Sequence, residues 1–205
     1  MNIIDFNYNL HCHTWSDIYE HIPTLAHYAS QCQHVTEMGM RSVVSSWALA
    51  KGLTLNPFQN KELVSIDLDY SPNIEPLKKA LKECSINFIF IMANDVKIKI
   101  QQTDLLFIDT FHVYAHLKEE LKCHADKVNK YIICHDITVD GVYGEAVRNG
   151  WNAVQISKET GYAVDDINKG LQPAVDEFLT QHPEWKIKQL YTNCNGLLIM
   201  ERVNR

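Results

Sequence analysis

Short apolar runs alternate with amphipathic segments along most of this chain. The apolar runs are each about as long as one buried strand and occupy residues 34–38, 63–66, 86–92, 105–108 and 131–134. Apolar positions that recur at helical spacing predict helices over about 17–31, 42–50, 74–84, 112–125 and 172–181. Strands that alternate with helices predict an α/β protein with a parallel sheet covered by helices on both faces.

The last part of the chain departs from this alternation. Two further strands are predicted over 185–191 and 197–203, and the segment between them contains the step Asn195-Gly196. Asn-Gly is typical of a tight hairpin turn, so the sheet should close with an antiparallel strand. The pattern as a whole predicts one domain over residues 1–205 with a seven-stranded, mostly parallel sheet.

Two segments do not show the period of a regular element. Residues 1–15 are polar and irregular, and we expect residues 1–32 to form an N-terminal cap that includes the first helix. Residues 141–170 are rich in glycine and carry isolated aromatic residues, which is typical of a long active-site loop or lid. Gly52 is expected to end the helix that begins near residue 42.

Charge and composition exclude several classes of function. The net charge of −6 argues against a nucleic-acid partner, because phosphate binding needs clustered Lys and Arg. No apolar run approaches the length of a membrane span, and the first residues lack the basic segment of a signal peptide. The 6 cysteines lie far apart without a CxxC pair, so we expect reduced thiols in a cytoplasmic protein.

Residues that can carry chemistry follow two of the predicted strands. Asp109 ends the 105–108 strand, and His112 follows at the expected start of a helix. His135 and Asp136 follow the 131–134 strand. Open α/β sheets place their ligands at the carboxyl ends of strands. Two carboxylates beside imidazoles suit an oxygen-preferring cation such as Mg²⁺, or a general base held beside one.

A second set of polar residues follows the first three strands. Gly39 lies in the first strand-to-helix turn, where glycine lets a ligand approach the backbone. Asp67 and Asp69 lie at the end of the second strand, where a carboxylate can accept hydrogen bonds from ribose hydroxyls. Asn94 and Asp95 follow the third strand and could contact the edge of a nucleobase. An ordinary turn or solvated charge is the alternative interpretation of each of these positions.

The segment His11-Cys12-His13 suggests a different function. On a strand, His-x-His would place both imidazoles on one face, ready to bind zinc or manganese, as in the opening metal motif of the PHP phosphoesterases. The later ligands of that family are not evident. A metal-dependent phosphoesterase-type hydrolase is therefore one alternative function, and a non-catalytic nucleotide-binding module is another.

Several motifs together resemble class I S-adenosylmethionine-dependent methyltransferases. They cover most of the chain and lie at residues 16–18, 36–42, 65–67, 104–109, 112–114, 134–136 and 193–197. Within the class, the chain is most similar to sugar and natural-product O-methyltransferases, including the macrolide-sugar, rhamnosyl and cephalosporin-hydroxylase-like group. It also resembles methyltransferase domains attached to glycosyltransferases in large algal viruses. The resemblance implies a Rossmann-like fold and methyl transfer to a sugar hydroxyl, such as that of a rhamnose-type residue of a glycan.

The resemblance also assigns the cofactor contacts. Glu37 and Gly39 would flank the methionine part of S-adenosylmethionine (SAM), with Ser42 and Ser45 nearby. Asp67, or alternatively Asp69, would hold the ribose, while Asn94 and Asp95 would meet the adenine. Arg41 replaces the second glycine that this group usually carries in its first loop.

For catalysis, the resemblance implies that Asp109, His135 and Asp136 bind Mg²⁺ and that His112, beside Asp109, is the general base. His135 stands where some relatives carry Glu, and Thr110 follows Asp109 where Gly is usual. A glycan acceptor is implied, as is fusion to or action beside glycosyltransferase domains. For a viral protein, the resemblance implies the host cytoplasm.

Overall fold

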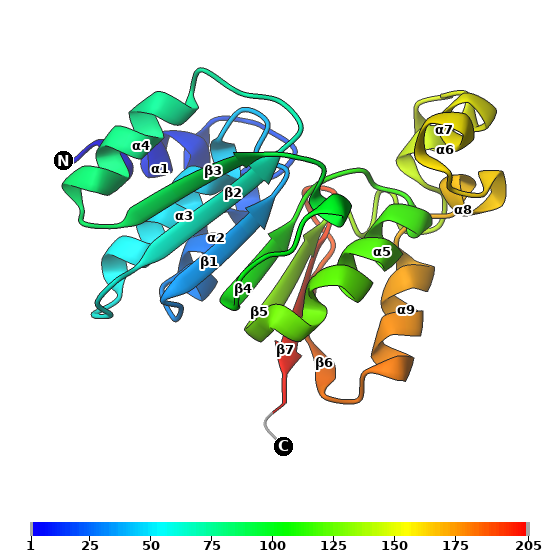
Figure 1. The fold of residues 1–205 in the computed structure, drawn as a ribbon. Helices are drawn as coiled ribbons and strands as arrows, with labels where there is room; N and C mark the ends of the chain where they lie inside the picture. Colours follow the sequence, from blue (N-terminus) through cyan, green and yellow to red (C-terminus); the bar gives the residue numbers. More distant parts are fainter. Residues whose placement is uncertain (1, 204–205) are drawn as a thin grey trace.

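A single seven-stranded sheet runs through the computed structural model, which describes residues 2–203 (Figure 1). The strand order is β3-β2-β1-β4-β5-β7-β6. The strands are β1 (His34–Met38), β2 (Glu62–Asp67), β3 (Asn87–Met92), β4 (Thr103–Ile108), β5 (Val128–His135), β6 (Trp185–Tyr191) and β7 (Leu197–Arg202). Strands β1 to β5 pair in parallel, and β7 is antiparallel to both β5 and β6. The predicted α/β, Rossmann-like sheet with its C-terminal hairpin is confirmed.

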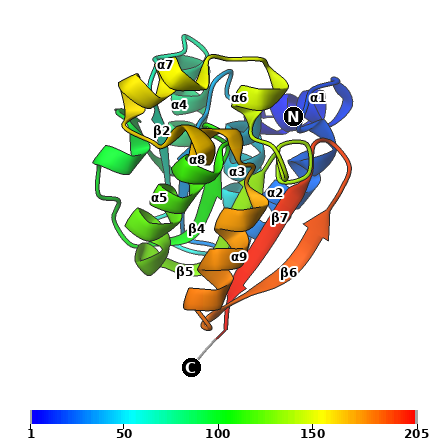
Figure 2. The same cartoon turned by 90° about the vertical axis from the view of Figure 1, so that its right-hand side faces the viewer.

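Helices cover both faces of this sheet (Figures 1 and 2). The first group is α1 (Ile3–His13), α2 (Ile22–Ala29), α3 (Val44–Leu55) and α4 (Ile74–Glu83). The second is α5 (Tyr114–His124) and α9 (Gln172–Gln181). Alternate residues of one strand face opposite sides. Accordingly Phe107 packs with the first group of helices, and Leu106 packs with the second.

The N-terminal segment is regular, contrary to the sequence-based expectation. Residues 3–13 form α1, whose N-cap Asn2 accepts a hydrogen bond from the Asp5 amide at 2.8 Å. The predicted helix over 17–31 is a short 3₁₀ turn at Tyr19–His21 followed by α2, with Pro23 in the first turn of α2. Proline is tolerated there because the first-turn amide has no intrahelical acceptor.

Gly52 does not end a helix, because α3 continues to Leu55. A Cβ atom on Gly52 would lie 2.4 Å from the carbonyl oxygen of Ala26 in α2. The glycine therefore permits close packing of α2 against α3. The prediction of a C-terminal stop was wrong because a close helix contact and a helix end both select glycine.

Residues 141–170 contain three short helices, α6 (Glu145–Arg148), α7 (Ala153–Thr160) and α8 (Val164–Asn168), in place of the predicted continuous loop. These helices lie at one end of the sheet, beyond α5 and α9 (Figure 2). Ala146 and Ile167 pack on Val113 in a small separate cluster. No helix within residues 2–203 is long and apolar enough to span a membrane.

The first strand-to-helix loop lies directly against the end of β4. Strands β2 and β4 flank β1 on opposite sides, so the chain changes direction across the sheet between β1 and β4. Such a switch point leaves a crevice at the carboxyl ends of the strands. A Cβ atom on Gly39 would lie 1.9 Å from the carbonyl oxygen of Asp109. Glycine is therefore required for the two loops to meet at the crevice.

Candidate functional site

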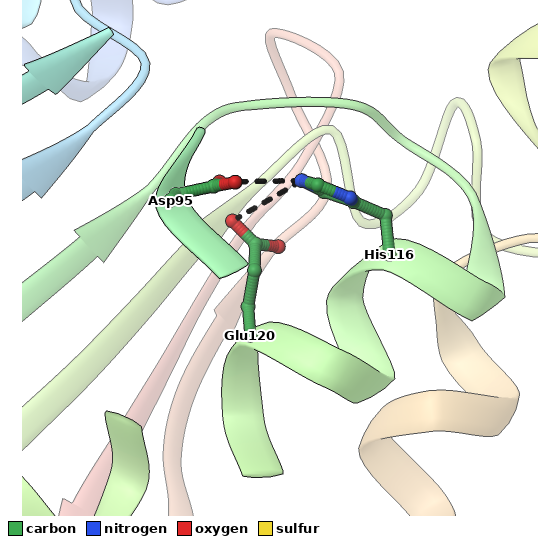
Figure 3. A group of neighbouring side chains, drawn as sticks. All are labelled: Asp95, His116 and Glu120. Atoms are coloured by element: carbon green, nitrogen blue, oxygen red, sulfur yellow. Dashed lines mark hydrogen bonds and ion pairs between the residues drawn. The ribbon is translucent and has the colours of Figure 1, made fainter. Parts of the chain in front are cut away.

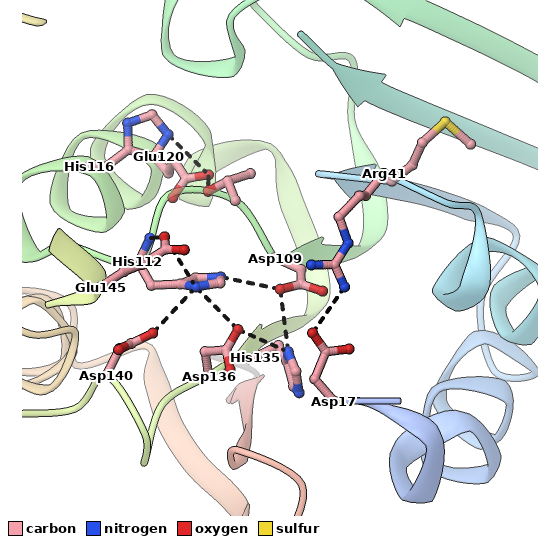
Figure 4. A network of polar contacts seen from close by, with 12 residues as sticks. Asp17, Arg41, Asp109, His112, His116, Glu120, His135, Asp136, Asp140 and Glu145 are labelled. Carbon is pink, nitrogen blue, oxygen red and sulfur yellow. Dashed lines mark hydrogen bonds and ion pairs between the residues drawn. The ribbon is translucent and has the colours of Figure 1, made fainter. Parts of the chain in front are cut away.

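Two histidines and a group of carboxylates meet where β4 and β5 end (Figure 4). His112 Nε2 lies 3.2 Å from Asp109 Oδ1, and His112 Nδ1 lies 3.1 Å from Asp136 Oδ2. His135 Nδ1 lies 3.3 Å from Asp109 Oδ1 and 3.4 Å from Asp136 Oδ2. The structure therefore brings together all four residues that the sequence singled out at these two strand ends.

His112 occupies a loop, whereas the sequence predicted the start of a helix. Helix α5 begins at Tyr114, and the carbonyl oxygen of His112 accepts a hydrogen bond from the Glu145 amide at 2.8 Å. This contact ties the His112 loop to α6. Asp136 follows β5 with a φ of 56°, in the left-handed region that few non-glycine residues adopt. Its carboxylate consequently turns back toward His112.

The side-chain cluster extends to residues that the sequence analysis missed. Asp140 is fully buried, with Oδ2 3.5 Å from His112 Nδ1, and it accepts two hydrogen bonds from Arg148 at 2.6 and 2.8 Å. Glu145 Oε2 lies 3.6 Å from His112 Nδ1. The sequence Asp140-Gly141 resembles an ordinary turn, and nothing local identifies Asp140 as a buried partner of His112.

This concentration of carboxylates controls the charge of both histidines. Burial opposes the charge on His112, but hydrogen bonds to Asp109 and Asp140 and the field of Asp136 outweigh burial and raise its pKa to about 10. Burial likewise opposes the charge on His135, yet Asp109 and Asp136 raise its pKa to about 11. Without another cation at the cluster, both imidazoles are protonated at neutral pH.

The cluster also has features of a cation site. One donor atom each from Asp109, His112 and Asp136 lie within 4.8 Å of one another. The buried Oδ1 of Asp136 has no hydrogen-bond partner among the described residues. His135 Nε2 lies 3.0 Å from the carbonyl oxygen of Cys194. Because a carbonyl can only accept, Nε2 carries a hydrogen and Nδ1 of a neutral His135 is free to bind a metal. The carboxylates of Asp109 and Asp136 and the imidazoles beside them are therefore donor groups of the kinds that hold divalent cations.

A cavity of about 690 Å³ adjoins this cluster. It is lined by five of the predicted cofactor residues and by two members of the cluster: Gly39, Asp67, Asp69, Asn94, Asp95, Asp109 and Glu145. The buried Oδ1 of Asn94 has no hydrogen-bond partner among residues 2–203 and can accept a hydrogen bond from a ligand. The volume lies in the range of small-molecule and cofactor sites.

Asp67 holds the first loop in place as well as lining the cavity. Its Oδ2 accepts hydrogen bonds from the backbone amides of Met40 and Arg41, each at 2.8 Å. The loop is strained: φ is 41° at Arg41 and 74° at the β-branched, buried Val43. Strain of this kind persists only where surrounding contacts enforce it and is frequent at binding sites.

Three predicted cofactor residues lie away from the cavity wall. Glu37 is fully buried and accepts hydrogen bonds from Ser45 at 2.6 Å, Ser46 at 2.6 Å and Ser65 at 2.7 Å. Burial outweighs these bonds and raises the pKa of Glu37 to about 7. Glu37 on β1 is thus hydrogen-bonded to α3, through Ser45 and Ser46, and to β2, through Ser65. Ser42 is exposed and does not line the cavity.

His11 and His13 do not form the site that a His-x-His strand would provide. Both lie on α1, and residues two apart on a helix point to nearly opposite sides. His13 Nδ1 lies 2.8 Å from the carbonyl oxygen of Asn9 in the same helix. The geometry removes the observation on which the phosphoesterase alternative depended.

Comparisons with known proteins support the fold. No protein-family model matches the chain, and no curated protein matches it. Among solved structures, it is similar to a Podospora anserina methyltransferase with SAH bound (TM-score 0.56, 16% identity, covering 98% of this chain and 88% of the other). It is also similar to a Bacillus cereus O-methyltransferase in complex with SAH (TM-score 0.54, 13% identity, covering 98% of this chain and 90% of the other). A Geobacter sulfurreducens methyltransferase is similar with a TM-score of 0.55 and 12% identity, covering 100% of this chain and 91% of the other. The chain has the Rossmann-like fold of these methyltransferases.

The charge on His112 gives the fold a pH dependence. Its pKa of about 10 in the folded chain exceeds the ordinary value of about 6.5, so the folded state binds this proton more tightly than the unfolded state. The resulting stabilisation is complete below about pH 6.5 and is lost as pH rises toward about 10. Relative to His112→Gln, chelator-treated wild-type protein should lose unfolding free energy across this window in urea titrations. A pH-independent difference would contradict this.

Proposed function

We propose that this protein is a SAM-dependent O-methyltransferase that acts on a sugar hydroxyl, such as one on a rhamnose-type residue of a glycan. The observation that carries the proposal is the position of the Asp109–His112–Asp136 cluster, which adjoins a cofactor-sized cavity at the switch point of the sheet. Similarity in fold to methyltransferases, two of them with SAH bound, supports it.

The cofactor would lie in the cavity between the first loop and the ends of β2 and β3. Asp69 lines the cavity and is exposed, so its carboxylate is accessible to ribose hydroxyls. Asp67 retains acceptor capacity beside the loop amides that it already holds. Asn94 offers its unpartnered oxygen to the exocyclic amine of adenine. Bound SAM would supply an electrophilic methyl group, and the protein would align the attacking oxygen with it.

His112 would remove the hydroxyl proton as general base. Its imidazole must first be neutral, and the carboxylates that raise its pKa are those suited to hold a cation. Mg²⁺ held by Asp109 and Asp136 would neutralise these carboxylates and would thereby favour the neutral form of His112. Bound Mg²⁺ would also acidify a hydroxyl that contacts it.

The helices beyond α5 support a sugar as the acceptor. Phe111 stacks on Trp151 with ring centroids 6.2 Å apart, and both line a second cavity of about 330 Å³. Asn152, Gln155 and Glu159 line the same cavity. Aromatic faces next to amide and carboxylate groups match the apolar faces and hydroxyl edges of a pyranose.

Calorimetric titration of SAM into chelator-treated protein, with and without added Mg²⁺, tests the proposal. We expect micromolar binding in both cases. Addition of Mg²⁺ should then permit transfer of labelled methyl groups to rhamnose-containing glycans. An absence of SAM binding would refute the methyltransferase assignment.

A second candidate function is cofactor binding without catalysis. The cavity at the switch point of the sheet favours it, because this cavity could hold a cofactor without any role for His112, which does not line it. SAM binding that is followed by no transfer to any acceptor, with or without Mg²⁺, would support this function.

A further inference from the structure

A second group of buried ionisable side chains lies beside the cavity, at Asp95, His116 and Glu120 (Figure 3). Asp95 begins the 3₁₀ turn Asp95–Lys97, and the other two lie four residues apart on one face of α5. His116 Nε2 lies 3.2 Å from Asp95 Oδ2 and 3.9 Å from Glu120 Oε1. One donor atom from each residue lies within 4.8 Å of the other two.

Each of these side chains is oriented by a hydrogen bond to a group outside the trio. His116 Nδ1 lies 3.0 Å from the hydroxyl of Tyr162, Asp95 Oδ1 accepts from the Val96 amide at 2.8 Å, and Glu120 Oε1 accepts from the Thr110 hydroxyl at 2.8 Å. In the neutral tautomer of His116 whose Nδ1–H donates to the Tyr162 hydroxyl, Nε2 carries a lone pair that can bind a metal ion. Outer hydrogen bonds that orient imidazole and carboxylate groups in this way are the usual support of metal ligands.

Glu120 provides an independent sign that a ligand is missing. Its side chain is fully buried, and its Oε2 has no hydrogen-bond partner in the part of the chain that the structure describes. In Figure 3 its carboxyl group points from α5 toward the gap between Asp95 and His116. Within residues 2–203, no Lys or Arg forms an ion pair with Asp95 or Glu120. Two buried carboxylates with one imidazole thus lack a full positive counter-charge, which is costly in a protein interior.

We propose that Asp95, His116 and Glu120 bind a divalent transition-metal ion of the Zn²⁺ type. Donor atoms around tetrahedral Zn²⁺ at bond lengths of 2.0–2.2 Å lie about 3.3–3.6 Å apart. The two distances from His116 Nε2 require only small side-chain adjustments to match this spacing. One imidazole with two carboxylates suits Zn²⁺ better than Mg²⁺, which prefers an octahedral shell of oxygens. Three protein ligands leave a coordination position for water or for a donor atom of the cavity's occupant.

Burial and the neighbouring Asp95 raise the pKa of Glu120 well above its ordinary value. The bound ion would join the Asp95–Lys97 turn to α5, with Tyr162 holding His116 from the segment between α7 and α8. This assignment makes Asp95 a metal ligand and leaves Asn94 to contact adenine. It does not depend on methyl transfer, because its observations concern only these residues.

Calorimetric titration of ZnCl₂ into the chelator-treated full chain tests the site. We expect zinc binding that weakens at least tenfold in both Glu120→Gln and His116→Gln, and about tenfold in Tyr162→Phe, since outer-shell partners typically contribute 10–100-fold to metal affinity. Glu119→Gln is the matched control, because Glu119 is a partly exposed residue of the same helix that pairs with Lys122. Asp109→Asn should retain zinc binding at this site.

Absence of zinc binding would overturn the proposal, as would binding lost in Asp109→Asn but retained in Glu120→Gln. If circular dichroism shows that Glu120→Gln does not fold, binding of Co²⁺ to the wild-type protein tests the site instead. Intense visible absorption bands of four-coordinate cobalt that change in Tyr162→Phe would support the site, and their absence would refute it. A separate SAM titration reports on the proposed methyltransferase function, so the two proposals can fail independently.

Discussion

Replacement of His112 by Gln is expected to slow methyl transfer to the sugar acceptor by about 10²–10⁴-fold, the usual contribution of a positioned general base. Affinity for SAM should be unchanged, because His112 contacts Asp109 and Asp136 and does not line the larger cavity. Transfer of labelled methyl groups measures the first effect, and calorimetry measures the second.

His27→Gln is the control for this substitution. His27 is exposed on α2, and its side chain contacts Gln31 and the ring of Tyr28, so its replacement should change neither quantity. A methyl-transfer rate in His112→Gln equal to that of the wild type would place the base elsewhere. Reduced SAM affinity in the same variant would show that His112 supports the cofactor cavity as well as the chemistry.

Gly39→Ala should have the largest effect on the fold. The φ of 80° is unfavourable for alanine, and the new Cβ would lie 1.9 Å from the Asp109 carbonyl oxygen. Backbone strain of about 1–3 kcal/mol adds to overpacking of about 1–3 kcal/mol. The free energy of unfolding should therefore fall by about 2–6 kcal/mol in urea titrations, and SAM affinity should fall because the loop moves away from β4.

Gly161→Ala separates the two contributions. Gly161 has a φ of 81°, nearly that of Gly39, but nothing lies within 4 Å of the Cβ that alanine would add. In Gly161→Ala the free energy of unfolding should fall only by the backbone strain of about 1–3 kcal/mol. Equal losses in the two variants would show that the loop adapts and that the close contact with Asp109 contributes little.

The sequence predicted the sheet well because its signals are local. Each buried strand is a short apolar run, and Asn195-Gly196 marks the final hairpin. Asp109 and His135 could be anticipated because each lies at the end of such a run, and neighbouring parallel strands bring their carboxyl ends to one edge.

The errors arose where tertiary contacts decide the outcome. Gly52 was assigned to a helix end because the sequence does not reveal that Ala26 lies against it. His112 was placed in a helix, although a hydrogen bond from the Glu145 amide to its carbonyl keeps the loop extended before α5. Asp140 was missed because its partner His112 lies in another loop. Glu120 was missed because Asp95, which completes the group with His116 on the same helix, comes from another element.

The position of β7 has a consequence for the order in which the chain can assemble. This strand inserts between β5 and β6, although β6 precedes it in sequence, and Leu197 to Met200 are buried. During synthesis β6 has no partner in the sheet until β7 leaves the ribosome. The loop that holds Cys194 against His135 forms in the same step. The histidine and carboxylate cluster can therefore reach its final geometry only late in folding, after the long-range pairing of β1 with β4 and the insertion of β7.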